Sequence, residues 1–321
     1  MRLSVIIPTR NRYEILRPTL AAMENQTLQK HEFEIIVVDT STDEYHRKKI
    51  REHQGQTATL RTLELDAGSV AAARNFGADK AEGEYLLFLN DDIVPALDTL
   101  KQHLEIHAES KERIAVIGKI RFADQVPKSC FVHYLENSCY YDSYSQVRDN
   151  PNILPPIHGN SSLSKELFNE VDQYDADLFT GYGAEAEELG LRLTKAGISV
   201  VYADGAIGYH TVAKTFEKVT QDMVETGAEV IKMFRKHPEI KSRKDVDTMV
   251  DSNAELSRAR RRVRADFTAK TDAIGMRFAN YFIKKAGNRV IFAGLLMKSF
   301  DKVLKAHYGR GMEEGLSKQV K

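Results

Sequence analysis

The chain is poor in the residues that mark small secreted domains. Its 321 residues include no tryptophan, and the two cysteines, Cys130 and Cys139, are too few for a disulfide framework. This cysteine content suits a reducing compartment and leaves open no more than a single bridge. A chain of this length can instead bury a large apolar core as one domain, or as one domain with an appendage. We therefore expect a cytoplasmic protein.

Long apolar runs and net charge are also missing. Residues 1–12 lack the apolar core and cleavage site of a signal peptide, and the most apolar late run, residues 290–297, is far shorter than the ~20 residues that span a bilayer. Lys and Arg total 46, as do Asp and Glu, so the formal net charge is zero. No whole-chain field then recruits nucleic acid or an acidic membrane. We expect no nucleic-acid partner, and only local, peripheral contact with any membrane.

Three largely apolar segments, the first two rich in β-branched residues, each end in polar residues. They are residues 3–7, followed by Pro8 and Thr9; residues 34–38, followed by Asp39; and residues 84–89, followed by Asn90, Asp91 and Asp92. Helical patterns at residues 13–25, 44–53 and 69–81 separate them. This alternation predicts an α/β fold, with a mainly parallel sheet covered by helices on both faces. Ligands bind at the carboxyl ends of such strands, which is where the polar residues fall.

The remainder of the chain predicts a change to helical structure. In order, the patterns indicate irregular connections with short strands at 122–157, a helix at 164–171, a helix at 185–196, a strand at 198–202 and helices over 215–308. Ser164 suits the N-cap of the first helix, and Gly197 suits the left-handed residue that follows the second. The expected domains are residues 1–212, with halves at 1–95 and 96–212, and a C-terminal helical extension at 213–321.

The adjacent carboxylates Asp91 and Asp92 indicate a cation site. They repel one another at a strand end, and hard cations such as Mg²⁺ or Mn²⁺ take carboxylate ligands and bridge diphosphate oxygens. Taken alone, the pair is better explained by a polar turn leading into residues 93–95. The neighbouring segments favour the cation.

The order of the segments SVIIPTRNR, IIVVDTSTD and AGSVAAARNFGADKAEGEYLLFLNDD resembles the inverting glycosyltransferases of family two, which have the Rossmann-like GT-A fold. The resemblance covers about residues 3–212. It implies a nucleotide-sugar donor site in which Pro8, Thr9 and Arg12 line the nucleotide pocket and Asp39 binds the base. It further implies that Arg74 faces the diphosphate, that Asn90 and Asp91 lie at the donor, with Asp91 at the ribose, and that Asp92 binds Mn²⁺ or Mg²⁺. The family's metal motif usually begins with an acid, and Asn90 replaces it here.

Residues 159–197 resemble the acceptor half of the same family. The resemblance implies that His158, Gly159, Asn160 and Tyr182 border the acceptor and that His210 completes the metal site. Ala186 stands where the family usually has its catalytic acid. An inverting transfer needs a base for the acceptor hydroxyl, so we expect the adjacent Glu185 to take this role. Glu187 and Glu188 are interpreted as an acidic helix start that the helix dipole favours.

The C-terminal region carries five arginines within residues 258–264, and apolar residues at helical spacing follow. One interpretation is a pair of helices packed on the rest of the protein with a solvated basic edge. The other is a basic amphipathic surface, residues 258–302, that rests on anionic lipid at the cytoplasmic face of a membrane or docks a partner.

Together these features predict a metal-dependent inverting transfer of a sugar to a saccharide or lipid-linked saccharide. Uridine diphosphate is the favoured carrier on family grounds, and thymidine and guanosine carriers stay open. An alternative is a catalytically silent protein that binds or assembles through its C-terminal helices. A sugar-1-phosphate nucleotidyltransferase is disfavoured, because residues 8–11 (PTRN) are not a glycine-rich loop.

Overall fold

The computed structural model describes residues 1–54, 59–66, 68–136, 154–242 and 293–317. These residues form two compact units. The first, here called the sheet unit, comprises Met1–Val126, Glu136–Thr180 and Glu185–Ala213. The second, the helical unit, comprises the described parts of Pro127–Leu135, Gly181–Ala184 and Lys214–Lys321.

The sheet unit is built on one mixed sheet of eight strands among the described residues. The strands are β1 (Leu3–Thr9), β2 (Phe33–Asp39), β3 (Leu60–Glu64), β4 (Tyr85–Leu89), β5 (Ile93–Pro95), β6 (Ile114–Phe122), β7 (Asn160–Ser164) and β8 (Ser199–His210). Their order across the sheet is β3-β2-β1-β4-β7-β6-β8-β5. The strands β1 to β4 run parallel, whereas β7 is antiparallel to both β4 and β6. The predicted α/β class with a mainly parallel sheet is confirmed.

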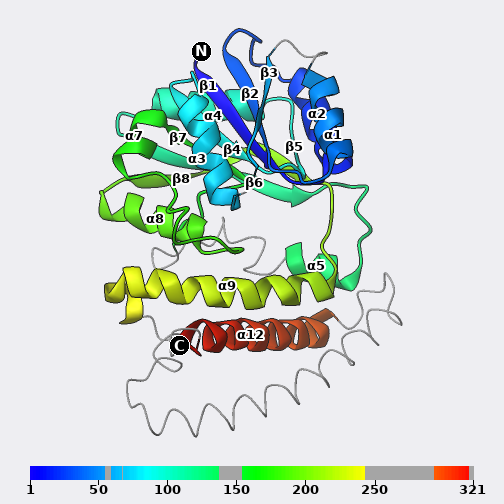
Figure 1. Cartoon of the computed structure of the whole chain (residues 1–321), viewed down its shortest axis with the longest axis vertical. Helices are drawn as coiled ribbons and strands as arrows, with labels where there is room; N and C mark the ends of the chain where they lie inside the picture. The colour runs from blue at the N-terminus through cyan, green and yellow to red at the C-terminus, as the bar shows by residue number, and fades with distance from the viewer. Residues whose placement is uncertain (55–58, 67, 137–153, 243–292, 318–321) are drawn as a thin grey trace, which may run out of the picture. The chain divides into compact units, whose positions relative to one another are not determined.

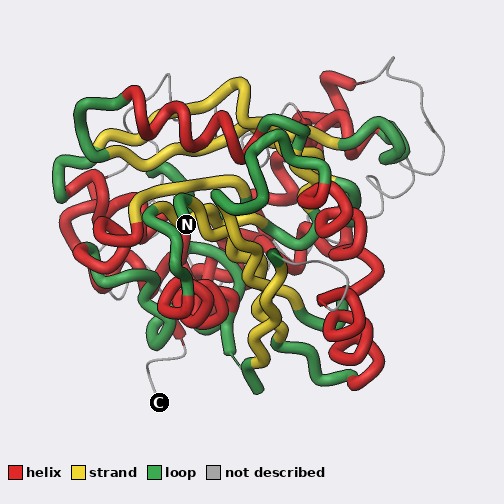
Figure 2. The backbone as a smooth tube through the Cα atoms, turned by 90° about the horizontal axis from the view of Figure 1, so that it is seen from above, coloured by secondary structure: helices red, strands yellow, loops and turns green. Residues whose placement is uncertain are grey.

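Helices cover both faces of this sheet (Figures 1 and 2). They are α1 (Tyr13–Glu24), α2 (Glu44–Gln54), α3 (Val70–Lys80), α4 (Thr99–Glu109), α7 (Lys165–Glu170) and α8 (Glu185–Lys195). Side chains of α3, α7 and α8 share one apolar core with Ile6, and those of α1, α2 and α4 share another with Val5 and Ile7. Successive residues of β1 thus enter opposite cores, which is why its sequence is continuously apolar.

Local signals in the sequence set several element boundaries. The Ser164 hydroxyl accepts a hydrogen bond from Leu167 N at 3.1 Å and caps α7, and Gly197 follows α8 with φ +75°, as predicted. Small residues bring α3 against the sheet, because a Cβ on Gly77 would lie 2.7 Å from Ile6 Cγ2.

Two parts of the sheet unit differ from the expected pattern. β8 continues to His210, well past the predicted strand at 198–202. Residues 204–206 of β8 bulge out opposite Gly118 and Lys119 of β6, and the pairing then resumes at Ile207. The segment expected to be irregular with short strands contains instead α5 (Cys130–Glu136), most of which belongs to the helical unit. Its apolar residues Phe131 and Leu135 are four apart and buried, which is helical spacing.

The helical unit contains α5, α9 (Phe216–Lys236), a short 3₁₀ turn (Pro238–Ser242) and α12 (Ala293–Ser317). α9 and α12 lie side by side, with backbone against backbone (Figure 1). A Cβ on Gly227 would overlap the Tyr308 carbonyl oxygen, and one on Gly311 would overlap that of Val224. The helical interpretation of the C-terminal region is confirmed for these elements, whereas most of the basic surface expected at 258–302 lies outside the described residues. No described helix is long and apolar enough to cross a membrane.

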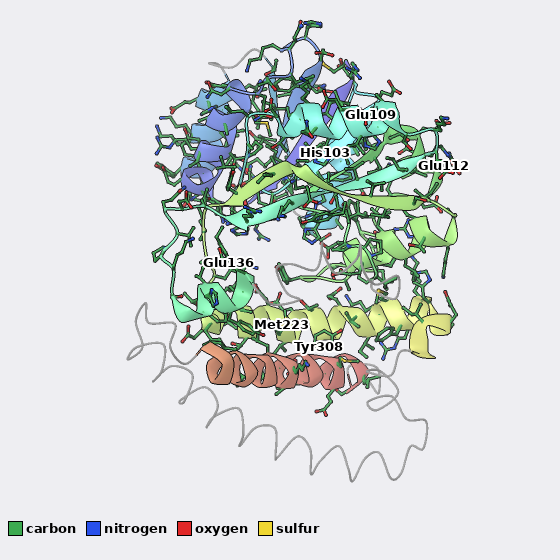
Figure 3. The ribbon with its side chains drawn as sticks, turned by 180° about the vertical axis from the view of Figure 1, so that it is seen from behind. His103, Glu109, Glu112, Glu136, Met223 and Tyr308 are labelled. Atoms are coloured by element: carbon green, nitrogen blue, oxygen red, sulfur yellow. The ribbon has the colours of Figure 1, made fainter. Side chains whose placement is uncertain are left out.

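A buried polar chain links α4 to β7 beneath the sheet. Asn160 Nδ2 donates to the Ala206 carbonyl at 2.9 Å, which turns its Oδ1 toward His103 Nε2 at 3.0 Å (His103 is labelled in Figure 3). His103 Nε2 is therefore the protonated nitrogen, and its Nδ1 accepts from the Ser162 hydroxyl at 2.8 Å. The same hydroxyl oxygen then accepts from His107 Nε2 at 2.8 Å. His103 is thus held neutral, because one of its ring nitrogens donates and the other accepts.

Burial lowers the pKa of His103 to about 4 and that of His107 to about 3, from an ordinary 6.5. Below pH ~6.5 the unfolded chain binds protons that the folded chain refuses, so stability is complete above that pH and falls as the pH drops toward 4. Each histidine contributes at most ~1.4 kcal/mol per pH unit. We expect the free energy of unfolding, from urea titrations, to fall between pH 7 and pH 5 by about 1–2 kcal/mol per histidine.

His107→Phe should remove about half of the total fall in stability, because one of the two histidines no longer titrates. The phenylalanine ring can still stack on Tyr85, on which His107 lies at 4.4 Å between centroids. His31→Gln, a change at an exposed histidine, serves as the control. An unchanged pH dependence in His107→Phe would show that the polar chain does not resist protonation.

Candidate functional site

The strands β1, β2 and β4 end together at one edge of the sheet. In the parallel register Thr9 lies opposite Asp39, and the Ile6–Phe88 pairing brings the end of β4 to the same level. Asn90, Asp91 and Asp92 follow β4 directly, so the polar residues predicted to meet at the carboxyl ends do so.

Asp91 and Asp92 are both buried and share one guanidinium. Arg12 Nη1 lies 3.0 Å from Asp91 Oδ1, and Arg12 Nη2 donates to Asp92 Oδ2 at 2.8 Å. The Thr9 hydroxyl donates to Asp91 Oδ2 at 2.9 Å. Burial, and then the charge of Asp92, raise the pKa of Asp91 to about 7 even though Arg12 and Thr9 lower it. The carboxylate pair is therefore short of positive charge.

Asn11 places Arg12 above this pair. Its Oδ1 accepts from the backbone N–H groups of Thr42 and Asp43 at 2.9 and 3.1 Å, and its own N–H donates to the Ser41 hydroxyl at 2.8 Å. Asn11 has φ 53°, a left-handed conformation that asparagine tolerates better than most residues. The loop after β1 is thus tied to the loop after β2. The sequence alone assigns no role to Asn11, because its hydrogen-bond partners follow a different strand.

Asp39 presents one carboxylate oxygen to the edge of the sheet. Oδ1 accepts from the backbone N–H of Ser41 at 2.8 Å, which fixes the side chain at the end of β2. Oδ2 is buried, and no residue in the described part of the chain donates a hydrogen bond to it. A buried acceptor of this kind is costly unless a ligand pairs with it.

His210 reaches the acidic pair through the antiparallel pairing of β5 with β8. Ile93 lies opposite His210, and Thr211 N donates to the Asp92 carbonyl at 3.0 Å. This register sets His210 Nε2 3.6 Å from Asp92 Oδ1. Residues 118 apart in the chain (210 − 92) thus lie beside one another.

Arg74 joins the metal-motif loop to the start of α8. Its Nη1 donates to Glu185 Oε1 at 3.1 Å and its Nη2 to Asn90 Oδ1 at 3.3 Å. The guanidinium lies over the ring of Tyr174, 5.4 Å from the centroid, and the Tyr174 hydroxyl donates to the Ile157 carbonyl at 2.6 Å. Burial raises the pKa of Tyr174, so it stays a neutral donor. The sequence contains no signal for Tyr174, which reaches Arg74 only in the folded chain.

The three glutamates in the first turn of α8 differ in their burial and in their partners. Glu185 is buried beside Arg74, and no described residue donates to its Oε2. Glu188 is buried as well, but Arg192 pairs with it one helical turn later at 2.8 Å. Glu187 is less buried. Glu185 is therefore the glutamate that lies with the other site residues.

The segment before β7 also reaches this edge. Gly159 has φ +72°, and its carbonyl accepts from Asn90 N at 3.1 Å. His158 precedes it, and Asn160 pairs with Leu89 in the sheet. Tyr182 belongs to the helical unit, where it is 46% exposed and accepts a hydrogen bond from Lys214 Nζ at 2.8 Å.

The donor set fits a hard divalent cation that is shared with a ligand. Asp91 and Asp92 together carry more negative charge than Arg12 offsets, and His210 adds a nitrogen beside Asp92. No three His, Cys, Asp or Glu side chains converge with ligand spacing within the described ranges. A cation held here would therefore take its other ligands from solvent or from a bound diphosphate.

A mixed, mainly parallel sheet with acidic residues at its carboxyl edge defines a GT-A-like α/β protein. The chain belongs to glycosyl transferase family 2, whose family model matches residues 4–172. It is 24% identical over 239 residues to chondroitin synthase of Escherichia coli, covering 65% of this chain and 34% of the relative. It is 27% identical over 262 residues to validoxylamine A glucosyltransferase of Streptomyces hygroscopicus subsp. jinggangensis, covering 74% and 61%. The chain spans 24–61% of the length of the first curated relatives that it matches.

Solved structures share the fold. A mannosyltransferase from Pyrobaculum calidifontis, in complex with GDP-Man and Mn²⁺, superposes with a TM-score of 0.65 at 16% identity, over 99% of this chain and 88% of that one. TarS 1–349 of S. aureus in complex with UDP-GlcNAc gives a TM-score of 0.53 at 19% identity, over 99% and 93%.

The hydrogen bonds of Asn11 should contribute measurably to the stability of the fold. Asn11→Ala should lower the free energy of unfolding by about 2 kcal/mol, because alanine disfavours positive φ and three side-chain hydrogen bonds are lost, the two to Oδ1 and the one that Nδ2 donates to the Thr42 hydroxyl at 3.0 Å. Asn11→Asp keeps the two acceptor bonds and should lose least. Urea unfolding of these variants, with the adjacent exposed Arg10→Ala as control, measures the difference. Equal stability of Asn11→Ala and wild type would contradict the role assigned to Asn11.

Proposed function

We propose that the chain transfers a sugar, with inversion, from a nucleotide diphosphate to a hydroxyl group of an acceptor in a cation-dependent reaction. One observation carries the proposal. The edge of the sheet brings a buried acceptor (Asp39), an acidic pair short of positive charge (Asp91 and Asp92) and a buried glutamate (Glu185) together in a member of glycosyl transferase family 2.

Asp39 and the loop after β1 are proposed to bind the nucleotide. The unpaired Oδ2 of Asp39 suits the N–H of a nucleobase such as uracil, which would satisfy it. Pro8 and Thr9 end the strand beside it, and Arg12 begins the helix that follows. Uridine diphosphate is the carrier we propose, and the structural relatives named above hold uridine and guanosine carriers.

Asp92 and His210 are proposed to hold Mn²⁺ or Mg²⁺, with Asp91 and Asn90 toward the ribose. Bound there, the cation would neutralise the leaving diphosphate. Arg74, held by Tyr174, Asn90 and Glu185, presents a further fixed positive charge from α3. A preorganised cationic group of this kind stabilises negative charge as it develops.

Glu185 is proposed as the base. Its Oε2 would take the proton of the acceptor hydroxyl while the hydroxyl oxygen bonds to the anomeric carbon and the bond from that carbon to the diphosphate breaks on the opposite face. Arg74 supports this role, because its contact with Oε1 fixes the carboxylate and leaves Oε2 for the acceptor.

The acceptor is proposed to be a saccharide, free or lipid-linked. His158, Gly159 and Asn160 lead into β7 beside Asn90, and Tyr182 precedes Glu185 by three residues. Several relatives are named for polysaccharide synthesis or for polymer modification, among them poly(ribitol-phosphate) beta-glucosyltransferase of Bacillus spizizenii. We propose action in the cytoplasm, with contact to an anionic membrane through residues 258–302.

Nucleotide binding tests the donor site. Calorimetric titration of wild type with uridine diphosphate should show binding that Mn²⁺ strengthens. Asp92→Ala and His210→Ala should each weaken the Mn²⁺-dependent part by about tenfold or more, because each removes a ligand. Asp98→Asn, at an exposed site before α4, is the control. If no nucleotide diphosphate binds with any cation, the silent binding protein becomes the better interpretation.

Sugar transfer tests the base. Glu185→Gln keeps the size of the side chain and cannot take a proton, so turnover with a responsive donor and acceptor should fall by roughly 10²- to 10⁴-fold. Nucleotide affinity should stay within about twofold of wild type, since Glu185 is not assigned to the donor. Glu187→Gln, two residues along α8, is the matched control. Near-normal turnover of Glu185→Gln would remove Glu185 as the base.

A further inference from the structure

Arg12 occupies the acidic pair in the way that a cation would. Its two terminal nitrogens contact one oxygen of each carboxylate, at 3.0 Å from Asp91 and 2.8 Å from Asp92. A planar guanidinium makes such two-point contacts with more directional strength than a flexible ammonium. Arg12 therefore binds the two carboxylates with a defined two-point geometry.

This contact competes with the proposed metal site. Asp92 has two carboxylate oxygens, and Arg12 donates to Oδ2, whereas His210 lies near Oδ1. A divalent cation brought close to Asp92 would also stand beside the Arg12 guanidinium, and like charges at such distances repel strongly where little water screens them. Arg12 and a metal ion cannot both keep the best positions.

Arg12 has a route out of the site. Its side chain is 38% exposed, although the two carboxylates that it contacts are almost fully buried. The residue stands at the N-cap of α1, where its side chain makes no capping hydrogen bond. Rotation of the side chain toward solvent would therefore break no helix cap.

We propose that Arg12 is a resident counter-ion that the divalent cation must displace from Asp92. The metal then binds weakly to the free protein and more tightly with the nucleotide diphosphate, whose phosphates accept the released guanidinium. The proposal rests on the proposed function for the diphosphate, but the competition between Arg12 and the metal can be measured without any nucleotide.

The test is titration of free protein with Mn²⁺, followed by the electron paramagnetic resonance signal of unbound Mn²⁺. Arg12→Ala should bind Mn²⁺ at least about tenfold more tightly than wild type, because the competing cation is gone. Arg12→Lys, which keeps the charge and loses the two-point contact, should fall between them. Arg17→Ala removes the same charge from an exposed position of α1 and should change the affinity by less than about twofold.

A second variant shows where the gained Mn²⁺ binds. In the Arg12→Ala, Asp92→Ala double variant the gain should disappear. Thermal unfolding with and without Mn²⁺ provides a folding control, and Arg12→Lys keeps the test available if Arg12→Ala does not fold. The proposal is overturned if Arg12→Ala binds Mn²⁺ no more tightly than wild type, or if Arg17→Ala gains as much.

Uridine diphosphate then separates this proposal from the proposed function. In wild type, the nucleotide should tighten Mn²⁺ binding by a larger factor than in Arg12→Ala, because only wild type has an arginine to displace. An equal factor in both would overturn the link to the diphosphate. A gain in Mn²⁺ affinity without any nucleotide binding or sugar transfer would support the Arg12 competition and refute the proposed function.

Discussion

Buried negative charge at the carboxyl edge of the sheet is the constraint on which the site depends. Asp91 and Asp92 leave water together, and an unpaired buried charge costs far more than a typical domain can spare. The chain responds with the guanidinium group of Arg12, before α1, which contacts both carboxylates. The raised pKa of Asp91 indicates that this compensation is incomplete. A further cation held at this edge would offset the remaining negative charge.

The reversed half of the sheet makes that edge possible. β7 runs antiparallel between β4 and β6 and begins with Asn160 opposite Leu89, so the segment before it meets the loop that carries Asn90. The polar chain from Asn160 to His107 anchors β7 to α4, and it holds the His103 imidazole neutral inside the sheet unit. The pairing of β5 with β8 then returns His210 to Asp92. Polar contacts and strand pairing therefore bring β7 and the end of β8 to the acidic pair, Asp91 and Asp92.

The parallel half of the fold was predictable from the sequence, and the reversed half was not. Continuous apolar strands that end in polar residues identify β1, β2 and β4, because burial on both faces leaves a clear pattern. β7 (NSSLS) is short and polar, and its burial depends on the histidines of α4, which no local pattern reveals. The same holds within the site. Asp39 and Asp92 could be located at strand ends, whereas the contacts of Asn11 and Tyr174 join loops and helices far apart in the sequence.

The replacement of the usual acid by Ala186 is best understood from the start of α8. Successive residues of an α-helix point about 100° apart, so the side chains of Glu185 and Ala186 leave the helix in different directions. Ala186 is buried, and its carbonyl accepts from Ile157 N at 3.2 Å, which holds the helix against the segment that leads to β7. A carboxylate at this position would need its own partner, and Arg74 is already engaged by Glu185. Glu185, one residue earlier, reaches Arg74, while alanine fills the packed position. Under the proposed function, the catalytic carboxylate would be displaced by one residue rather than lost.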